Sequence, residues 1–345
     1  MYTTSITGLQ AACLHHVGRP NFDEGFTLSN SLVKLDAESI RNLMIYGLSS
    51  FKNEELMHFH NVVDLDCNEV YKCVQSIFDD PDTLLLHSQN LARYLYLKST
   101  HPNIKAGDLL VVYYNDCEID GVLVDAVGIY KSENLSDFLS MECSEYGSSV
   151  ISHKGVSLTH VDKAALILNT NADDGFSIAV IDNTTNKSDA KYWVEDFLGV
   201  VPQQDRYFQT RNFMSVCKSF VTKQLPEEFD ISKADQVELL NRSVQYFKSN
   251  DEFSLNEFVE TVLEQPEVIE SFNIYKDKYQ QERDITFEDS FSISGDAVKK
   301  QARSFKSVIK LDKNFHIYVH GNRNLIEQGE DEKGRYYKVY YKEEY

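Results

Sequence analysis

The stretch that decides the fold spans residues 108–130 and reads DLLVVYYNDCEIDGVLVDAVGIY. It holds two apolar runs, 108–115 and 122–130, and each has the length and the β-branched and aromatic content of a strand. The residues between the runs end in Asp120-Gly121, a pair that favours a tight turn. We therefore expect an antiparallel hairpin here.

Further strands and helices flank this hairpin within residues 1–185. Alternating or continuous apolar runs predict strands at 6–15, 26–35, 150–156, 163–169 and 176–182. Apolar residues at helical spacing predict three helices: one that follows Asp36 as N-cap, one over 68–78, and one that starts at Asp82 or Thr83 and ends before Pro102. Several antiparallel strands with helices on one face account for this order of elements.

The polar run 183–188 marks a boundary, because the pattern beyond it becomes helical. Helices are expected at 190–198 (capped by Asp189), 206–224 (stopping before Pro226), 232–248, 255–264 and 266–281. From residue 284 strands return, at 287–293, 305–311, 315–320 and 336–341, with a short helix over 297–303 and an acidic loop over 329–334. The sequence thus predicts an α+β protein: a mixed antiparallel sheet with helices (1–185), a helical middle region (186–283), and a small C-terminal antiparallel sheet packed with it (284–345).

Composition places the chain among ordinary globular proteins. Hydrophobic residues make up 42% of 345 residues, and 20 Phe and 20 Tyr supply apolar area to bury. No run reaches the roughly 18–20 apolar residues of a membrane-spanning helix. The N-terminus has neither a cationic start nor an apolar segment typical of a secretory signal. The six cysteines form no CxxC pair, so we expect reduced, mostly buried thiols in a cytoplasmic protein.

Motifs for catalysis or cofactor binding are missing from the sequence. It contains no GxGxxG, GxxxxGK[ST], GxSxG or HExxH. His15 and His16 would point to opposite faces of a strand, and His58 with His60 supplies only two ligands where a zinc site needs three or four. The acidic pairs Asp64/Asp66 and Asp173/Asp174 are interpreted as solvated turns, since such pairs arise readily among 54 acidic residues. We therefore expect no enzyme, no cofactor and no metal site.

Net charge constrains any contact with nucleic acid. A charge of −20 argues against a general DNA-binding surface, so such a role needs a local basic patch. Residues 296–323 carry seven Lys and Arg against two Asp, a net +5. Lys299 and Arg303 share a helix face, and Lys306 and Lys310 share a strand face, with His316, Tyr318 and His320 alternating on the next strand. The candidates here are Lys299, Lys300, Arg303, Lys306 and Lys310.

A second basic cluster lies on the predicted helix 206–224. Arg206, Arg211, Lys218 and Lys223 occur there with no acidic residue between the first and the last. Arg211 and Lys218 are two helical turns apart and share a face, whereas the interleaved Tyr207, Phe208 and Phe213 are expected to pack inward. The residue types alone leave two interpretations of both clusters open. Their cations contact phosphates, or they form ion pairs at the surface with the abundant acidic residues.

Several runs in the second half carry a resemblance to a known family. They are DAKYWVEDFL (189–198), FMSVCKSF (213–220), KADQ (233–236), AVKKQARSFKSVIKLD (297–312) and KNFHI (313–317). In these runs the chain resembles the bacterial nucleoid-associated protein family of chains near this size. The resemblance implies association with the nucleoid through DNA or a DNA-bound protein, and no catalytic activity. It assigns no residue to DNA contact.

Two hypotheses follow for a protein of the cytoplasmic nucleoid. The first is weak duplex binding without sequence preference through the basic segment, with Arg206, Arg211 and Lys218 as additional contacts. The alternative is an acidic interaction module that docks on a DNA-processing enzyme or another nucleoid protein without touching DNA. A homo-oligomer fits either, since bivalency multiplies weak contacts. A nuclease is disfavoured, because no set of acidic residues with a lysine stands out as a magnesium site.

Overall fold

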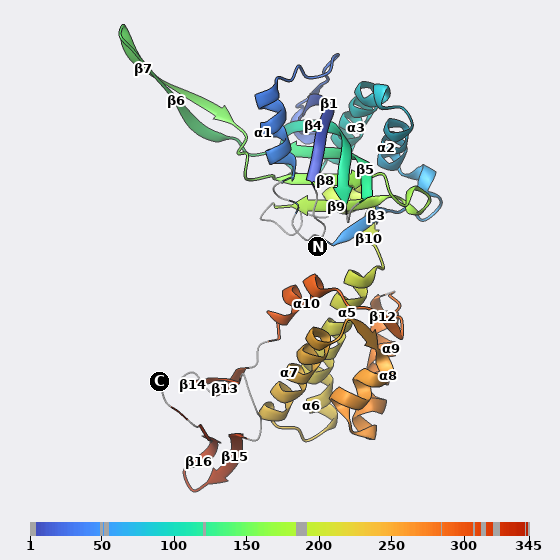
Figure 1. Ribbon diagram of the computed structural model, residues 1–345, viewed down its shortest axis with the longest axis vertical. Helices are drawn as coiled ribbons and strands as arrows, with labels where there is room; N and C mark the ends of the chain where they lie inside the picture. The colour runs from blue at the N-terminus through green and yellow to red at the C-terminus, as the bar shows by residue number, and fades with distance from the viewer. Residues whose placement is uncertain are drawn as a thin grey trace. The chain divides into compact units, whose positions relative to one another are not determined.

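The computed structural model describes residues 5–48, 51, 55–119, 122–183, 192–283, 285–305, 308–311, 315–319, 325–341 and 343 (Figure 1). The chain divides into two compact units, Met1–Gln203 and Gln204–Tyr345. The first is built around a sheet and the second around helices, as the α+β prediction requires.

An eight-stranded antiparallel sheet forms the first unit, in the order β10-β3-β9-β8-β5-β4-β1-β2. The predicted hairpin is confirmed, because β4 (Gly107–Ile119) pairs with β5 (Val122–Ser132) in the middle of this sheet. Its strands are longer than predicted, with a register shift between Tyr114 and Cys117. The other strands are β1 (Ser5–Val17), β2 (Phe26–Thr27), β3 (Leu56–Phe59), β8 (Lys163–Leu168), β9 (Ser177–Asp182) and β10 (Val200–Pro202).

Side-chain caps start the first two predicted helices of this unit, whereas Thr83 precedes the third without a capping hydrogen bond. Asp36 accepts a hydrogen bond from the Ser39 amide at 2.7 Å and starts α1 (Ala37–Leu48). Asn68 accepts from the amides of Val70 and Tyr71 and starts α2 (Glu69–Asp79), which is followed by α3 (Leu84–Lys98). These side chains satisfy amide donors that a helix leaves unpaired at its N-terminus.

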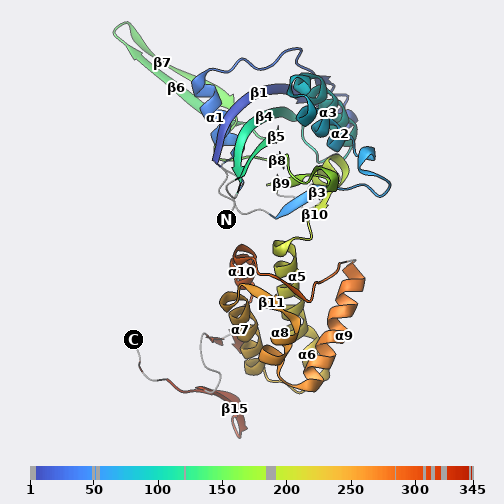
Figure 2. The ribbon, with the colours of Figure 1, turned by 45° about the vertical axis from the view of Figure 1, so that its right-hand side comes forward.

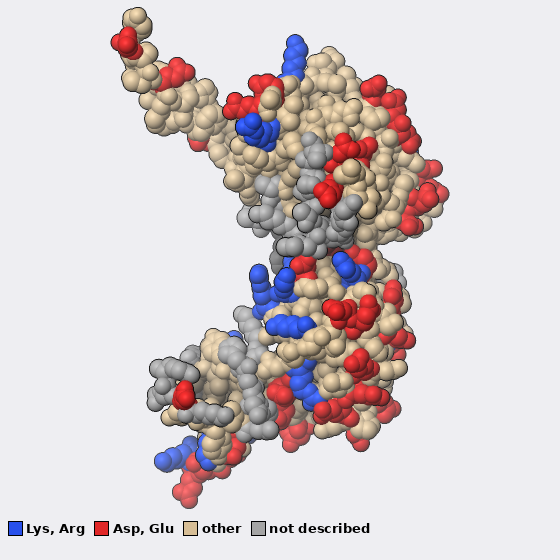
Figure 3. Space-filling view, viewed as in Figure 1, with Lys and Arg blue, Asp and Glu red and all other residues tan. Residues whose placement is uncertain are grey.

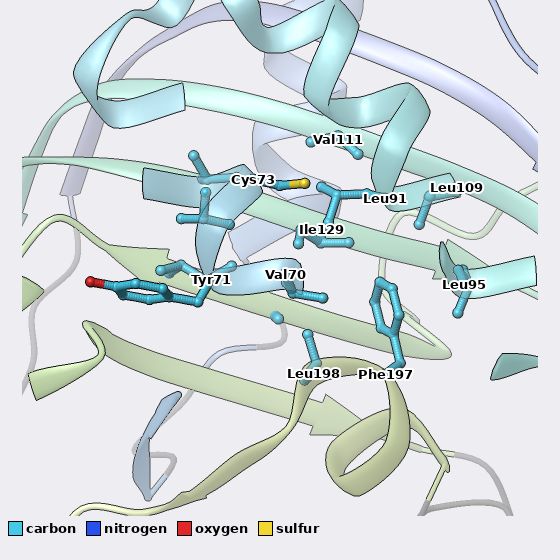
Figure 4. Packing of buried hydrophobic residues seen from close by; sticks show 14 of the residues in the cluster. Val70, Tyr71, Cys73, Leu91, Leu95, Leu109, Val111, Ile129, Phe197 and Leu198 are labelled. Atoms are coloured by element: carbon cyan, nitrogen blue, oxygen red, sulfur yellow. The ribbon is translucent and has the colours of Figure 1, made fainter. Parts of the chain in front are cut away.

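Helices cover both faces of the sheet, not one as predicted. On one face α2, α3 and the π-helical segment Tyr192–Leu198 form a core with the strands. Figure 4 shows this core through Val70, Tyr71, Cys73, Leu91, Leu95, Leu109, Val111, Ile129, Phe197 and Leu198. The opposite face packs against α1, where Tyr46 joins the alternate residues Val112 and Tyr114. Because β4 and β5 are apolar on both faces, they need cover on both.

Two segments of the first unit differ from the sequence prediction. The strand expected at 26–35 is limited to Phe26–Thr27, because Ser29 and Ser31 bond to each other locally instead of joining a ladder. The strand expected at 150–156 belongs to a longer hairpin, β6 (Ser136–Ser144) with β7 (Gly147–Gly155), which extends from the sheet between β5 and β8 (Figures 1 and 2). Its first strand was not predicted.

The second unit is a helical bundle with an aromatic core. Its helices are α5 (Arg206–Ser219), α6 (Leu225–Glu228), α7 (Lys233–Ser249), α8 (Leu255–Phe258), α9 (Pro266–Arg283) and α10 (Gly295–Ala302). The prediction that the helix from Arg206 stops before Pro226 is wrong. It continues through the π-helical segment Phe220–Gln224 into α6, where Pro226 lies in the first turn. Proline is tolerated there because that amide needs no helical partner.

Short antiparallel pairs complete the second unit. β11 (Glu252–Ser254) pairs with β12 (Ser290–Ser292), and β13 (Val308–Leu311) pairs with β14 (Phe315–Tyr318). β15 (Ile326–Asp331) pairs with β16 (Gly334–Val339), so the prediction of an acidic loop over 329–334 is wrong for most of that range. The turn is confined to two residues before Gly334, which has φ +117°. The strand predicted over 287–293 is likewise reduced to Ser290–Ser292. In the described part of the chain no helix is both long and apolar enough to cross a membrane.

Candidate nucleic-acid interface

Helix α5 separates its aromatic side chains from its basic ones. Tyr207, Phe208 and Phe213 are buried, as predicted. Arg206 is exposed, and Arg211 and Lys218 are half-buried at the margin of the core. The Arg211 guanidinium lies 5.7 Å from the Phe208 ring centroid and donates to Asn212 Oδ1 at 3.4 Å. The stem of Arg211 is therefore packed against the helix.

Helix α10 presents its cations to solvent. Ala297 and Val298 are buried, whereas Lys299 and Lys300 are exposed, with Arg303 exposed at the C-cap. Lys299 has 80% of its side chain exposed and an ammonium 3.6 Å from Asp296 Oδ1. Surface pairs of this kind contribute only about 0–1 kcal/mol. Lys299 can therefore exchange its carboxylate partner for a phosphate at little cost.

A buried hydroxyl joins the two helices. Thr210 Oγ1 of α5 accepts a hydrogen bond from the Ser294 amide at 3.0 Å and donates to the Arg206 carbonyl at 2.7 Å. Ser294 is also the N-cap of α10, and its hydroxyl accepts from the Ala297 amide. Val298 then enters the aromatic core that contains Phe213. The structure thus places on adjacent helices two basic clusters that are far apart in the sequence.

Lys310 lies on the strand pair that follows α10. Within β13 the neighbouring Ile309 is buried against α7, whereas Lys310 is exposed opposite His316. Tyr318, with 64% of its surface exposed, lies on the same face as His316. This face therefore alternates as predicted for Lys310, His316 and Tyr318. Lys306 and His320 lie outside the described residues, so their predicted positions stay predictions.

Charge is sorted within the second unit. Residues 206–226 hold four cations and no anion, whereas residues 251–289 hold three cations and twelve anions. In Figure 3, Lys and Arg side chains gather on the side of this unit that carries α10 and α7, and Asp and Glu prevail toward α8 and α9. The two basic clusters therefore share a polarised unit in which the acidic residues lie mainly elsewhere.

The remaining candidates from the sequence have structural roles. His15 and His16 point to opposite faces, as predicted: His15 is buried with Nε2 at 2.9 Å from Ser88 Oγ, and His16 Nδ1 lies 2.7 Å from Asp108. Burial lowers the pKa of His15. His58 Nδ1 bonds to the Asp174 carbonyl, and Asp64 accepts from the Asp66 amide in an exposed turn. Over the residues that the structure describes, no group of three or more His, Cys, Asp or Glu is arranged to hold a metal ion.

A buried charged cluster in the first unit was not predicted from the sequence. Lys131 and Lys163 are both fully buried at paired positions of β5 and β8. Lys131 donates to Glu133 at 2.9 Å, and Lys163 donates to Asp182 at 2.9 Å. The signal that could have revealed the cluster is a lysine directly beside each of two apolar runs, 126–130 and 164–168. Burial lowers the pKa of Lys131, and the neighbouring Glu133 carboxylate opposes this shift.

Comparison with known proteins identifies one family. A family model described as nucleoid-associated protein YejK matches residues 14–334, which is nearly the whole chain. A comparison with curated proteins gives no match. The matched range spans most of both units and includes every basic residue considered above.

Proposed function

Because the chain belongs to the bacterial family described as nucleoid-associated protein YejK, we propose that it binds duplex DNA directly through the face formed by α5 and α10. The observation that supports this proposal most is the Thr210 link, which fixes Arg206 and Arg211 on one helix beside Lys299, Lys300 and Arg303 on the next. We call these five cations the α5–α10 face. Binding at this face would bring the protein to the nucleoid.

Electrostatics support a weak contact without sequence preference. Exposed lysines and arginines neutralise phosphates and release counterions, which supplies affinity that is independent of sequence. The chain as a whole is repelled by DNA at its charge of −20, so only the polarised unit can approach productively. Lys218 and Lys310 extend the set of possible phosphate contacts at its margins. A non-enzymatic role completes the proposal, since the carboxylates and histidines considered above serve turns and core packing.

Charge reversal in the α5–α10 face tests the proposal. The Lys299→Glu/Arg303→Glu variant should weaken binding to a fluorescent duplex at least tenfold at low salt, because two attractive contacts become repulsive. The matched control is Lys333→Glu/Arg335→Glu in the β15–β16 hairpin, which makes the same charge change at exposed residues of the same unit. An equal loss in both variants, or in neither, would exclude the α5–α10 face as the binding site.

A second candidate function has its own observation. A groove of about 440 Å³ in the second unit has an apolar floor that includes Leu225, Phe229 and Val268, and its lining also includes Asp230 and Glu238. This chemistry suits a basic, partly apolar segment of another protein, as an acidic module docking on a nucleoid protein requires. This function would be favoured over the first if the purified protein fails to bind DNA yet retains nucleoid proteins after nuclease treatment. The variant Asp230→Lys/Glu238→Lys should then abolish that retention.

A further inference from the structure

The β13–β14 pair packs one face on the second unit and leaves the other face open. Ile309 of β13 is buried in a small core with Ala234 and Val237 of α7. Ile317, directly opposite Ile309 on β14, packs against the same core. Because side chains alternate along a strand, the neighbours of these two isoleucines point the other way. We call the surface that they form the ribbon face; its residues are Val308, Lys310, His316 and Tyr318.

Two aromatic rings lie next to each other on the ribbon face. His316 and Tyr318 are both exposed, and Tyr318 has 64% of its surface in solvent. They are two residues apart on β14, which is about 7 Å along a strand. Stacked bases in a duplex are only about 3.4 Å apart along each strand. The rings are therefore spaced for the bases of an extended, unpaired strand.

The duplex itself cannot use these rings in the same way. A base inside a duplex is stacked between its neighbours, so its ring faces are already covered. In a single strand those faces are open, and stacking on aromatic side chains is a common way in which proteins hold single strands without sequence preference. The ribbon face thus differs in ligand chemistry from the α5–α10 face, whose five cations suit the phosphates of a duplex.

Charge on the ribbon face also suits a nucleic acid. Lys310 is exposed directly opposite His316, so its ammonium group lies on the same face as the two rings. The described residues of the two strands, 308–311 and 315–318, include no Asp or Glu. The surrounding sequence 305–323 contains four Lys and Arg against one Asp. A phosphate of the strand whose bases stack there would meet positive charge.

An apolar protein partner fits the ribbon face less well. Its one aliphatic side chain is Val308, which is half-buried, so the face offers little apolar area beyond the two rings. Behind the rings, Val319 and Ile326 are buried in the same small core as Ile309. The strands that carry the rings are thus held from behind before any ligand arrives, which lowers the ordering cost of binding.

We infer that the ribbon face binds single-stranded DNA, with bases stacked on His316 and Tyr318 and a phosphate at Lys310. DNA is the nucleic acid assigned, because the family is associated with the nucleoid. The inference goes beyond the duplex contact proposed above and uses none of the cations of the α5–α10 face. The site holds a strand where a duplex opens, and it needs no particular base, since every base has a ring face.

Fluorescence anisotropy with a labelled oligothymidylate of about 12 nucleotides, a length typical of small single-strand sites, tests this inference on the full-length chain. His316→Ala/Tyr318→Ala should weaken binding at least tenfold, whereas His316→Phe/Tyr318→Phe keeps both rings and should bind like the wild type. The matched control Tyr336→Ala/Tyr340→Ala removes two exposed rings elsewhere in the same unit and should leave affinity unchanged. A wild type that does not bind the oligothymidylate, or an equal affinity in all four proteins, would overturn the inference.

An abasic oligonucleotide of the same length separates stacking from phosphate contact. It keeps the phosphates and lacks the bases, so the wild type should bind it at least tenfold more weakly than the oligothymidylate. Equal affinity for the two probes would overturn stacking. Tighter binding of an oligouridylate than of the oligothymidylate would overturn the assignment to DNA.

A labelled duplex separates this inference from the proposed function. His316→Ala/Tyr318→Ala should bind the duplex like the wild type, because the bases of a duplex do not reach the rings. An equal loss of affinity for duplex and single strand would overturn a site specific for single strands. Binding of the oligothymidylate without any binding of the duplex would reject the proposed function of the α5–α10 face and leave the ribbon face in place.

Discussion

The two units differ most in how they distribute charge. The first contains 13 Lys and Arg against 28 Asp and Glu, a net charge of −15, and it buries part of that charge in ion pairs inside the sheet. The second contains 21 against 26, a net charge of −5, and it sorts its charge by surface. The contrast shows how a chain of net charge −20 can still carry a local surface rich in Lys and Arg: local sorting matters more than the total.

The hydrophobic cores of the two units also differ. The first unit encloses titratable groups such as His15, Lys131 and Lys163. The second unit is centred on Phe213, whose ring lies 4.3–6.4 Å from six other phenylalanine rings. We therefore expect the stability of the first unit to respond to pH and that of the second to depend on packing.

The largest effect is expected from Phe213→Ala. Removing a fully buried aromatic ring costs about 3–5 kcal/mol, enough to unfold a marginally stable unit. Unfolding monitored by hydrogen exchange should show the helices of the second unit losing protection while the sheet of the first unit keeps its own. Loss of protection across both units together would show that they fold as one.

A smaller effect, with a pH signature, is expected from His15→Gln. The His15 ring accepts from the Ser29 amide and donates to Ser88, so the variant should lose about 2–3 kcal/mol at pH 7.5. Burial holds the pKa of His15 below its ordinary value of 6.5, so the unfolded chain takes up the proton first as the pH falls. The stability from neutral His15 is thus complete above about pH 6.5 and is lost below it.

Denaturant unfolding at several pH values measures this. The difference between wild type and His15→Gln should narrow from pH 7.5 to 5.5. The adjacent, exposed His16→Gln serves as the control and should change stability by less than about 0.5 kcal/mol. A constant difference across the pH range would contradict the role given to His15.

A still smaller effect is expected from Thr210→Val. The variant keeps the shape of the side chain but leaves the buried Ser294 amide without its acceptor, which costs about 1–2 kcal/mol. DNA affinity should fall several-fold, because the start of α10 loses its hydrogen bond to α5. Thr210→Ser retains the hydroxyl and should behave like the wild type. If Thr210→Val is destabilised but binds DNA as tightly as the wild type, the position of α10 does not determine DNA affinity.

Local patterns predicted most of the elements but not their partners. Capping by Asp36, the helix predicted over 68–78 and the apolar runs of β4 and β5 rest on short-range features, and the structure confirms them. The alternate residues of β4 are apolar on both faces, so both faces of the sheet need helices that cover them. The pattern of a single strand does not show which helix covers which face. β6 was missed because its serines and acidic residues obscure the alternation.

The candidate interface was predictable in composition and not in geometry. The runs around Lys299 and Arg211 stand out by charge alone, and the burial of Phe213 follows from helical spacing. Their union depends on long-range contacts, the packing of Val298 into the core that contains Phe213 and the hydrogen bond from the Ser294 amide to Thr210. Neither residue carries a charge or a motif. No local feature of the sequence marks that pair.

The salt dependence of DNA binding tests the central claim most directly. With about five phosphate contacts, the slope of log K against log salt should be about −4 to −5 for the wild type. Lys299→Glu/Arg303→Glu should make that slope less steep by about two units, whereas Lys333→Glu/Arg335→Glu should leave it unchanged. A slope near zero, or one that is the same in all three proteins, would contradict phosphate binding by the α5–α10 face.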